Sequence, residues 1–278
     1  MRIFFIIFAG FIFWPLISLA EDINFSSKDV LQGDTVVVSV FNKIPVEATL
    51  GGLSSSIFKY RDHYRIVFGV SPDKKPGQYS LKITFQDGTI FDDYINVRKR
   101  RFRIVELGIP KELDLTPKAL TKELGVIKKS LSPILDSVNP RVFFDKSFGL
   151  PLADNKSISS YFGEIRKTGS ESIRHLGVDF GAPLGKYVYV INSGVVSRAY
   201  EDKVYGKSVI IDHGAGIYSL YLHLNKVFVS QGQSLSKGNI LGTVGKTGYA
   251  TSPHLHFSVK VRGVSVDPIG FVNAFAGQ

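Results

Sequence analysis

The chain of 278 residues contains no cysteine. Disulfide bridges, a thiol nucleophile, thiolate-bound metals and a lipid-modified cysteine are therefore excluded. Any metal ion must be held by histidine, aspartate or glutamate side chains. Repeats of fixed period and low-complexity tracts are also absent. The hydrophobic fraction of 44% is ordinary for a globular protein, and the length allows two modest domains.

Only one long apolar run occurs, within residues 1–20. It follows the positive charge of Arg2, contains Pro15 and closes on the small residue Ala20, directly before Glu21. This layout is typical of a cleavable secretory signal. An uncleaved membrane anchor is the alternative, because the run is nearly long enough to span a bilayer, but the proline and the small-residue exit favour cleavage. We therefore expect an exported protein of the periplasm or cell envelope, or a secreted one, without stable membrane insertion after signal cleavage.

Negative charge is comparatively scarce, since 24 Asp and Glu stand against 34 Lys and Arg and the formal net charge is +10. Such a surplus favours anionic partners through long-range attraction. An exported protein meets anionic wall polymers and lipid head groups before nucleic acid, so we do not expect nucleic acid as a partner. The basic run Arg98–Arg101 is interpreted as a solvated face or linker, the commoner role of such clusters.

Residues 21–108 are predicted to form a small β-sandwich. Their runs of Val, Ile, Phe, Tyr and Thr are interrupted by turn-forming pairs such as Pro-Gly and Asp-Gly. From Tyr79 to Phe85, apolar and polar residues alternate, which places one strand face in a core and the other in water. The predicted strands are 35–41, 46–50, a long stretch at 57–70, 78–85 and 89–97.

Residues 109–149 are predicted to be a helical linker. Thr116 is placed to cap a helix that begins at Pro117. Apolar residues then recur at helical spacing, so we expect the helix to pack on one neighbour. These residues are Leu120, Leu124, Ile127 and Leu131.

Residues 150–278 are predicted to form a compact antiparallel all-β domain that is dense in glycine. Hairpin turns are indicated by the sequences at 192–194 and 213–216. The predicted strands are 187–191, 194–199, 208–212, 217–223, 240–244 and 254–261.

Five of the six histidines fall in this last segment, so the chemistry is expected there. His254 and His256 are two residues apart, and on a strand their side chains project from the same face. His175 and Asp179 are four apart, which fits one face of a helix or an extended strand. The glycine and the β-branched valine between them favour the extended chain.

Two histidines and one carboxylate form a three-ligand set for Zn²⁺, which leaves the fourth corner of the tetrahedron open. An open corner indicates catalysis rather than a structural role. Hydrolysis also needs groups that orient water and stabilise the oxyanion. His223 and the remaining member of the His-x-His pair are the candidates. A His-x-His pair or a His-x-x-x-Asp spacing alone more often belongs to surface or hydrogen-bonded structure than to a metal site.

The stretch from about residue 159 to 272 closely resembles the lysostaphin/LytM-type family of zinc endopeptidases. The resemblance is carried by motifs that stand in the family's order. They are Ser160-Tyr-Phe-Gly163, His175-Leu-Gly-Val-Asp179-Phe, Ile211-Asp-His-Gly214, Tyr221-Leu-His-Leu224, Val244-Gly-Lys-Thr-Gly248 and Pro253-His-Leu-His-Phe257.

By this resemblance His175, Asp179 and His256 are the ligands of one zinc ion per chain, and His223 and His254 take the catalytic places. The implied fold of residues 150–278 is an antiparallel β barrel-sandwich hybrid, the duplicated hybrid motif. The implied activity is that of a zinc metalloendopeptidase that hydrolyses peptide cross-links or stem peptides of bacterial peptidoglycan, with a zinc-bound water as nucleophile. Peptidoglycan is thus the implied partner, and the oligomeric state stays open.

Other functions remain open at this point. A peptidoglycan carboxypeptidase would use the same zinc site with a different groove. A non-catalytic activator of other wall hydrolases would keep the fold, although the intact ligand set argues against it. A zinc-stabilised structural protein would need a fourth protein ligand. The segment before residue 150 is interpreted as restraining the active site or as a docking domain.

The chain departs from the family pattern at three places: Lys207-Ser208 stands where asparagine is frequent, Ser252 where a glycine is frequent and Ser258 where an acidic residue is common. None is a predicted ligand or catalytic position, so we expect effects on substrate preference more than on activity. Of the other histidines, His213 is interpreted as a turn or surface residue rather than a group beside the metal, and His63 as structural or exposed.

Overall fold

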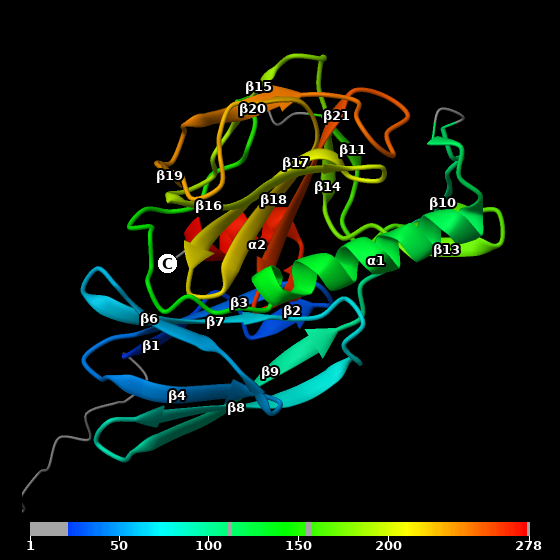
Figure 1. Cartoon of the computed structure of the whole chain (residues 1–278). Coiled ribbons are helices and arrows are strands. Elements are labelled where there is room, and N and C mark those ends of the chain that lie inside the picture. The colour runs from blue at the N-terminus through cyan, green and yellow to red at the C-terminus, as the bar shows by residue number, and fades with distance from the viewer. Residues whose placement is uncertain (1–21, 111–112, 154–156, 277–278) are drawn as a thin grey trace, which may run out of the picture.

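The computed structural model describes residues 22–110, 113–153 and 157–276. The predicted signal at residues 1–20 lies outside the described residues. Strands predominate, as predicted, and the helices in the described ranges are α1 and α2 (Figure 1). Neither of these two helices combines the length and apolarity that a membrane crossing requires.

Residues 23–98 form two sheets. One has four antiparallel strands in the order β1-β3-β7-β6, and the other has five in the order β2-β9-β8-β4-β5, where β2 and β9 are parallel. Four predicted strands agree with observed ones to within a residue at each end. The strands are β1 (Ile23–Phe25), β2 (Asp29–Leu31), β3 (Thr35–Val40), β4 (Pro45–Leu50), β5 (Leu53–Ser54), β6 (Ser56–Tyr60), β7 (His63–Gly69), β8 (Gly77–Phe85) and β9 (Ile90–Arg98).

The four-stranded sheet is buried on both faces. Val36 and Val38 of β3 pack in a core shared with the five-stranded sheet, whereas Val37 and its neighbour Val67 on β7 pack in a second core with the C-terminal strands. Because successive side chains of a strand point to opposite faces, the run of three valines from Val36 to Val38 in β3 contributes to both cores. This sheet therefore lies between the five-stranded sheet and the C-terminal part (Figure 1).

The stretch predicted as one long strand at 57–70 is instead a hairpin of β6 and β7. The two strands are joined through Arg61 and Asp62. Arg61 has a φ of 58°, a left-handed conformation that glycine or asparagine fills more readily. Without such a residue the turn gave too weak a signal to divide the apolar run.

Most strands after residue 157 form one ten-stranded sheet with the main order β11-β14-β21-β18-β17-β16-β19. β18 pairs on one side with β17 and on the other with β21 and, near its end, β20. The sheet therefore forks at β18, and no closed barrel is present among the described strands. The strands are β11 (Ile158–Ser160), β14 (Val178–Gly181), β15 (Tyr187–Tyr189), β16 (Gly194–Asp202), β17 (Gly206–Gly214), β18 (Ile217–Val227), β19 (Ser234–Leu235), β20 (Ile240–Val244), β21 (His254–Val261) and β22 (Val264–Val266).

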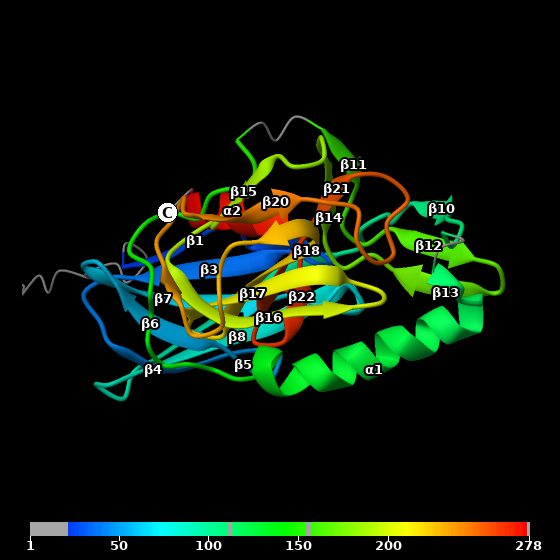
Figure 2. The same cartoon turned by 45° about the horizontal axis from the view of Figure 1, so that its top comes forward.

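One of the two hairpin turns predicted in this segment is present. Ala215 and Gly216 connect β17 to β18, both with positive φ. The hairpin predicted at 192–194 is wrong, because β15 pairs with β20, and β16 pairs with β17 and β19. The β15–β20 ribbon lies on the opposite side of the C-terminal part from the N-terminal sandwich (Figures 1 and 2).

Helix α1 (Pro117–Leu135) begins where predicted. The Thr116 hydroxyl accepts from the backbone N–H of Ala119 at 3.2 Å, and Pro117 opens the first turn. The apolar face of the helix packs on β17 and β18. Its buried residues are Leu120, Ile127, Leu131 and Leu135, with Leu124 partly buried.

A short sheet connects the two parts of the chain beside α1. β10 (Ile104–Glu106) pairs in parallel with β12 (Ile165–Thr168), and β12 pairs with β13 (Glu171–Arg174). Just before β10, Arg100 pairs with Asp34 of the N-terminal part and with Asp267, which precedes α2 (Pro268–Ala276). The connecting segment therefore has charged and backbone contacts with both parts.

Candidate metal centre

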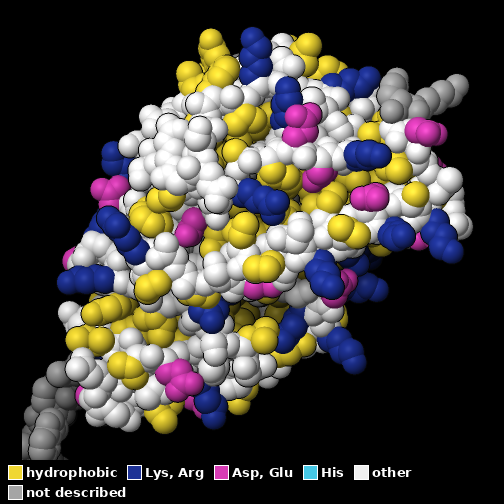
Figure 3. Space-filling view, in the orientation of Figure 1, with side chains coloured by type: hydrophobic (Ala, Val, Ile, Leu, Met, Phe, Trp, Pro, Cys, Tyr) yellow, Lys and Arg dark blue, Asp and Glu magenta, His cyan; other side chains and the backbone are white. Residues whose placement is uncertain are grey.

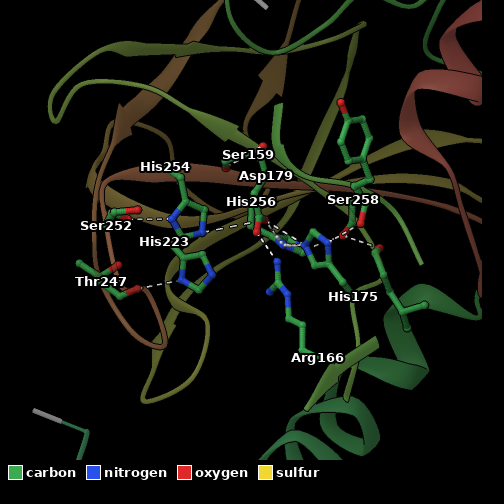
Figure 4. Close-up of polar contacts among 12 residues, drawn as sticks. Ser159, Arg166, His175, Asp179, His223, Thr247, Ser252, His254, His256 and Ser258 are labelled. Carbon is green, nitrogen blue, oxygen red and sulfur yellow. Dashed lines mark hydrogen bonds and ion pairs between the residues drawn. The ribbon is translucent and has the colours of Figure 1, made fainter. Parts of the chain in front are cut away.

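The predicted metal ligands come together on two neighbouring antiparallel strands. Asp179 of β14 lies directly opposite His256 of β21. His175 precedes β14, in the segment that follows β13. Because β21 side chains alternate, His254 projects from the same face as His256. Figure 4 shows the side chains of these residues, together with His223, gathered at one place.

The three predicted ligand side chains present one atom each to a common point. His175 Nε2 lies 3.0 Å from Asp179 Oδ1 and 2.9 Å from His256 Nδ1, and His256 Nδ1 lies 2.8 Å from Asp179 Oδ1. All three residues are buried. Among the described residues, this is the cluster of histidine and carboxylate groups with the spacing of a metal site.

The hydrogen bonds of His175 and His256 determine which ring nitrogen presents its lone pair to that point. His175 Nδ1 donates to the Tyr161 carbonyl at 2.9 Å, so its proton is there and Nε2 is free. His256 Nε2 lies 2.8 Å from Ser258 Oγ, whose hydroxyl donates to the Leu176 carbonyl at 2.8 Å. The hydroxyl proton is thus used, so His256 Nε2–H must donate and Nδ1 is free.

This arrangement fits a divalent cation. Two lone pairs and a carboxylate oxygen within 3.0 Å of one another repel unless a positive charge lies among them. Burial lowers the pKa of His256 to about 4, so the ring is neutral at pH 7 as a metal ligand requires. Two imidazoles and one carboxylate are a common zinc donor set with room for a further ligand.

Asp179 is held from its other side by Arg166. The Arg166 guanidinium pairs with Asp179 Oδ2, while Oδ1 faces the histidines. Burial alone would raise the pKa of Asp179, but interactions with His175 and His256 outweigh it and hold the pKa well below the usual 3.8. The carboxylate is therefore ionised, and Arg166 orients it from the side away from the histidines.

His223 and His254 present the same nitrogen to the centre. Their Nδ1 atoms donate to the carbonyls of Thr247 and Ser252, both at 2.8 Å, so each neutral ring has its lone pair on Nε2. His254 Nε2 lies 3.9 Å from Asp179 Oδ1, and the His223 and His254 ring centroids are 4.9 Å apart. The pair therefore lines the space beside the ligand cluster (Figure 4).

His223 owes its place to an unusual backbone. Its φ is 61°, in the left-handed region, and its N–H donates to the Tyr205 carbonyl at 3.0 Å. Regular alternation along β18 would give it the orientation of Tyr221, which is buried in the core. Burial, followed by the charges of His254 and His256, lowers the pKa of His223 to about 3 and keeps it neutral at pH 7.

The structure brings the five predicted site residues together and places the other two histidines elsewhere. His213 is fully buried, and its ring lies between the Ser193 carbonyl and Ser219 Oγ, so its interpretation as a turn or surface residue is wrong. His63 is also buried, and it stacks on Phe41 with centroids 4.7 Å apart.

Two residues that contact the predicted ligands were not identified from the sequence as parts of the site. Arg166 comes from β12, and nothing in the spacing of sequence motifs points it toward Asp179. Ser258 was noted only as a departure from the family pattern, although it lies two residues after His256 and hence on the same strand face. That period-two relation was the signal that could have found it.

Comparisons with known proteins agree with this geometry. A family model described as peptidase family M23 matches residues 173–268. Peptidoglycan DD-endopeptidase ShyA of Vibrio cholerae is 42% identical over 93 residues, which are 34% of this chain and 22% of ShyA. DD-carboxypeptidase/endopeptidase Mpg of Neisseria meningitidis is 37% identical over 95 residues, which are 34% of this chain and 22% of Mpg.

A solved structure extends the likeness in fold to most of the chain. A crystal structure from Pseudomonas aeruginosa, of a protein assigned to peptidase M23, superposes with a TM-score of 0.65 and 25% identity over 88% of this chain and 95% of that chain. The curated relatives are matched over less than a quarter of their own length. All five predicted site residues lie within residues 173–268, the segment that matches the model of peptidase family M23.

Proposed function

We propose that this protein is a zinc-dependent peptidase that hydrolyses peptide cross-links of bacterial peptidoglycan. The observation that carries the proposal is the convergence of four histidine rings and one carboxylate on one buried point. Three of them, His175 Nε2, Asp179 Oδ1 and His256 Nδ1, are the proposed ligands. The other two are the Nε2 atoms of His223 and His254.

The roles follow from this division. Zinc held by the three ligands would supply a Lewis acid that polarises a peptide carbonyl and makes hydroxide available at neutral pH. His223 and His254 contribute Nε2 lone pairs that accept a proton from water. Each ring, once protonated there, can return the proton to the leaving amine or hydrogen-bond an oxyanion. The carbonyls of Thr247 and Ser252 keep both rings in the required tautomer.

The proposed substrate rests on the relatives. ShyA is named a peptidoglycan DD-endopeptidase, and Mpg a DD-carboxypeptidase/endopeptidase. The net charge of +10 favours an anionic polymer. The second candidate is therefore a carboxypeptidase that trims stem peptides at the same site, which the name of Mpg supports.

We also propose a role for each part of the chain. Residues 1–20 act as the export signal, residues 21–108 form the N-terminal sandwich, 109–149 the helical linker and 150–278 the peptidase domain. The enzyme would act in the periplasm or cell envelope, where peptidoglycan is found.

The test combines metal analysis with digestion of purified peptidoglycan. The protein should hold about one zinc ion per chain by elemental analysis, in keeping with one three-ligand site. It should also release fragments with new amine termini, while a His256→Ala variant does neither. His63→Ala is a matched control, because His63 is also a buried histidine but lies in the N-terminal sandwich.

The products separate the two candidates. Conversion of cross-linked fragments to uncross-linked ones, read by mass spectrometry, identifies an endopeptidase. Release of free amino acids from uncross-linked stem peptides identifies a carboxypeptidase. Failure of the wild type to bind zinc would overturn both and favour a non-catalytic activator.

A further inference from the structure

We propose that Ser258 is a positioning residue that holds His256 in the tautomer and orientation of a metal ligand. The proposal rests on the proposed zinc function. The role of Ser258 in this chain follows from its own contacts. It is buried on β21, on the same face as His256.

A single hydroxyl joins the ligand ring to the backbone of the neighbouring segment. Ser258 Oγ lies 2.8 Å from His256 Nε2 and 2.8 Å from the carbonyl oxygen of Leu176. Leu176 immediately follows the ligand His175. The hydroxyl therefore connects β21, which carries one ligand, to the segment that carries the other two (Figure 4).

The direction of the two hydrogen bonds is fixed by chemistry. A carbonyl oxygen can only accept, so the one hydroxyl proton of Ser258 goes to Leu176. The hydroxyl can then only accept from His256, which requires the ring proton on Nε2. This leaves the Nδ1 lone pair facing Asp179 Oδ1 at 2.8 Å, where the ligand atom must be.

His256 differs from the other three histidines of the site in this respect. His175, His223 and His254 each donate from Nδ1 to a backbone carbonyl. His256 is oriented the opposite way round and depends on a side-chain hydroxyl. Of these four histidines, His256 is therefore the one whose tautomer-fixing partner can be removed by a single side-chain substitution.

Gly177 closes the space around this contact. A Cβ atom at Gly177 would lie 2.5 Å from Ser258 Oγ and 2.6 Å from both His256 Nε2 and the Phe257 carbonyl oxygen. These distances are far shorter than a van der Waals contact. The glycine between the ligands His175 and Asp179 thus allows their segment to lie against the His256–Ser258 pair.

This close packing makes the hydroxyl hard to replace. Removing it leaves the buried His256 Nε2–H and Leu176 carbonyl without their partner, and an unsatisfied buried polar group is destabilising. The ring can relieve this by shifting its proton to Nδ1 or by rotating, and either change removes the ligand atom. Partners that orient a metal ligand in this way typically contribute 10- to 100-fold in metal affinity.

The experiment compares Ser258→Ala with Ser265→Ala in the full-length protein. Ser265 is a buried serine on the adjacent strand β22, and it accepts from Lys260 Nζ at 2.9 Å, away from the ligands. Zinc dissociation constants are measured by competition with a chromogenic chelator. Circular dichroism confirms the fold of each metal-free variant. Nitrogen-15 NMR of the zinc-loaded protein reports the proton on His256 Nε2.

We expect Ser258→Ala to raise the zinc dissociation constant about 10- to 100-fold, with Ser265→Ala close to wild type. The wild type should show a slowly exchanging proton on His256 Nε2 that the Ser258→Ala variant lacks. Equal zinc affinities for wild type and Ser258→Ala, or a wild type without that protected proton, would overturn the proposal. A wild type that binds no zinc would instead refute the proposed function, so the two failures are distinguishable.

Discussion

Arg166 pairs with Oδ2 of Asp179, while Oδ1 of the same carboxylate faces His175 and His256. The two oxygens of one side chain are thus divided between an orienting cation and the proposed metal. Asp179 can therefore bind a metal through one oxygen, Oδ1, while Oδ2 is held by Arg166.

Replacing Arg166 with alanine should weaken zinc binding about 10- to 100-fold, because Asp179 loses the partner that fixes its orientation. Chelator competition provides the measurement. Arg174→Ala is the control, since Arg174 pairs at 3.0 Å with Asp73, whose side chain is 74% exposed. Exposed pairs of this kind contribute little. Equal losses in both variants would contradict the role given to Arg166.

Replacing His223 or His254 with alanine should leave zinc bound while lowering turnover by about 10²- to 10⁴-fold, the usual contribution of general acid–base catalysis. Neither residue is among the three proposed ligands. Zinc content and the rate of peptide-bond cleavage are measured on the same preparations. Loss of metal from both variants would show that this division between ligands and catalytic residues is incorrect.

Removing the metal should lower the thermal stability of the protein. The lone pairs of His175 and His256 and the Asp179 carboxylate repel one another when no cation lies among them. At a free zinc concentration 100 times the dissociation constant, binding adds about 2.7 kcal/mol to the free energy of unfolding. Differential scanning calorimetry with and without chelator measures this shift, and in Asp179→Ala the shift should be absent or much smaller.

The buried His213 should make stability depend on pH. Burial lowers its pKa in the folded protein to about 4, whereas an unfolded chain takes up the proton near 6.5. The unfolded state therefore binds more protons below pH 6.5, so this contribution to stability is complete above 6.5 and is lost as the pH falls toward 4. Between pH 7.5 and 5 the loss is about 2 kcal/mol.

Urea unfolding of zinc-loaded wild type and His213→Asn at these two pH values measures that difference. The variant should be less stable at pH 7.5, because Ser219 loses one of its two hydrogen-bond partners, His213, and keeps only Tyr221. Its stability should nevertheless fall by about 2 kcal/mol less than that of the wild type between pH 7.5 and 5. An unchanged pH dependence would mean that His213 is not the titrating group.

Strands and helices that depend mainly on their own residues were predicted from local sequence patterns. The period of two in β8 and the cap and apolar spacing of α1 are properties of short segments, and the structure contains both elements. The five histidine and aspartate positions were found through motifs that resemble those of the lysostaphin/LytM-type family, and regular strand alternation indicated which of them share a face. That rule places His254 and His256 on one face.

Features that depend on distant parts of the chain were not predictable in this way. The contact of Arg166 with Asp179 arises because β12 joins a small sheet with β10. The orientation of His223 depends on a left-handed backbone that its neighbours in β18 do not signal. The burial of β3 on both faces depends on the packing of the C-terminal strands against the sandwich, which no local pattern in β3 indicates.

The four-stranded sheet β1-β3-β7-β6 serves as a common wall for two hydrophobic cores. Val37 and Val67 pack with the C-terminal strands. Detaching the N-terminal sandwich would therefore expose apolar surface to water on the sandwich and on the C-terminal part. Heat or denaturant should therefore melt the chain in one cooperative transition rather than half by half. The sandwich is in this sense part of the scaffold that keeps the metal centre folded.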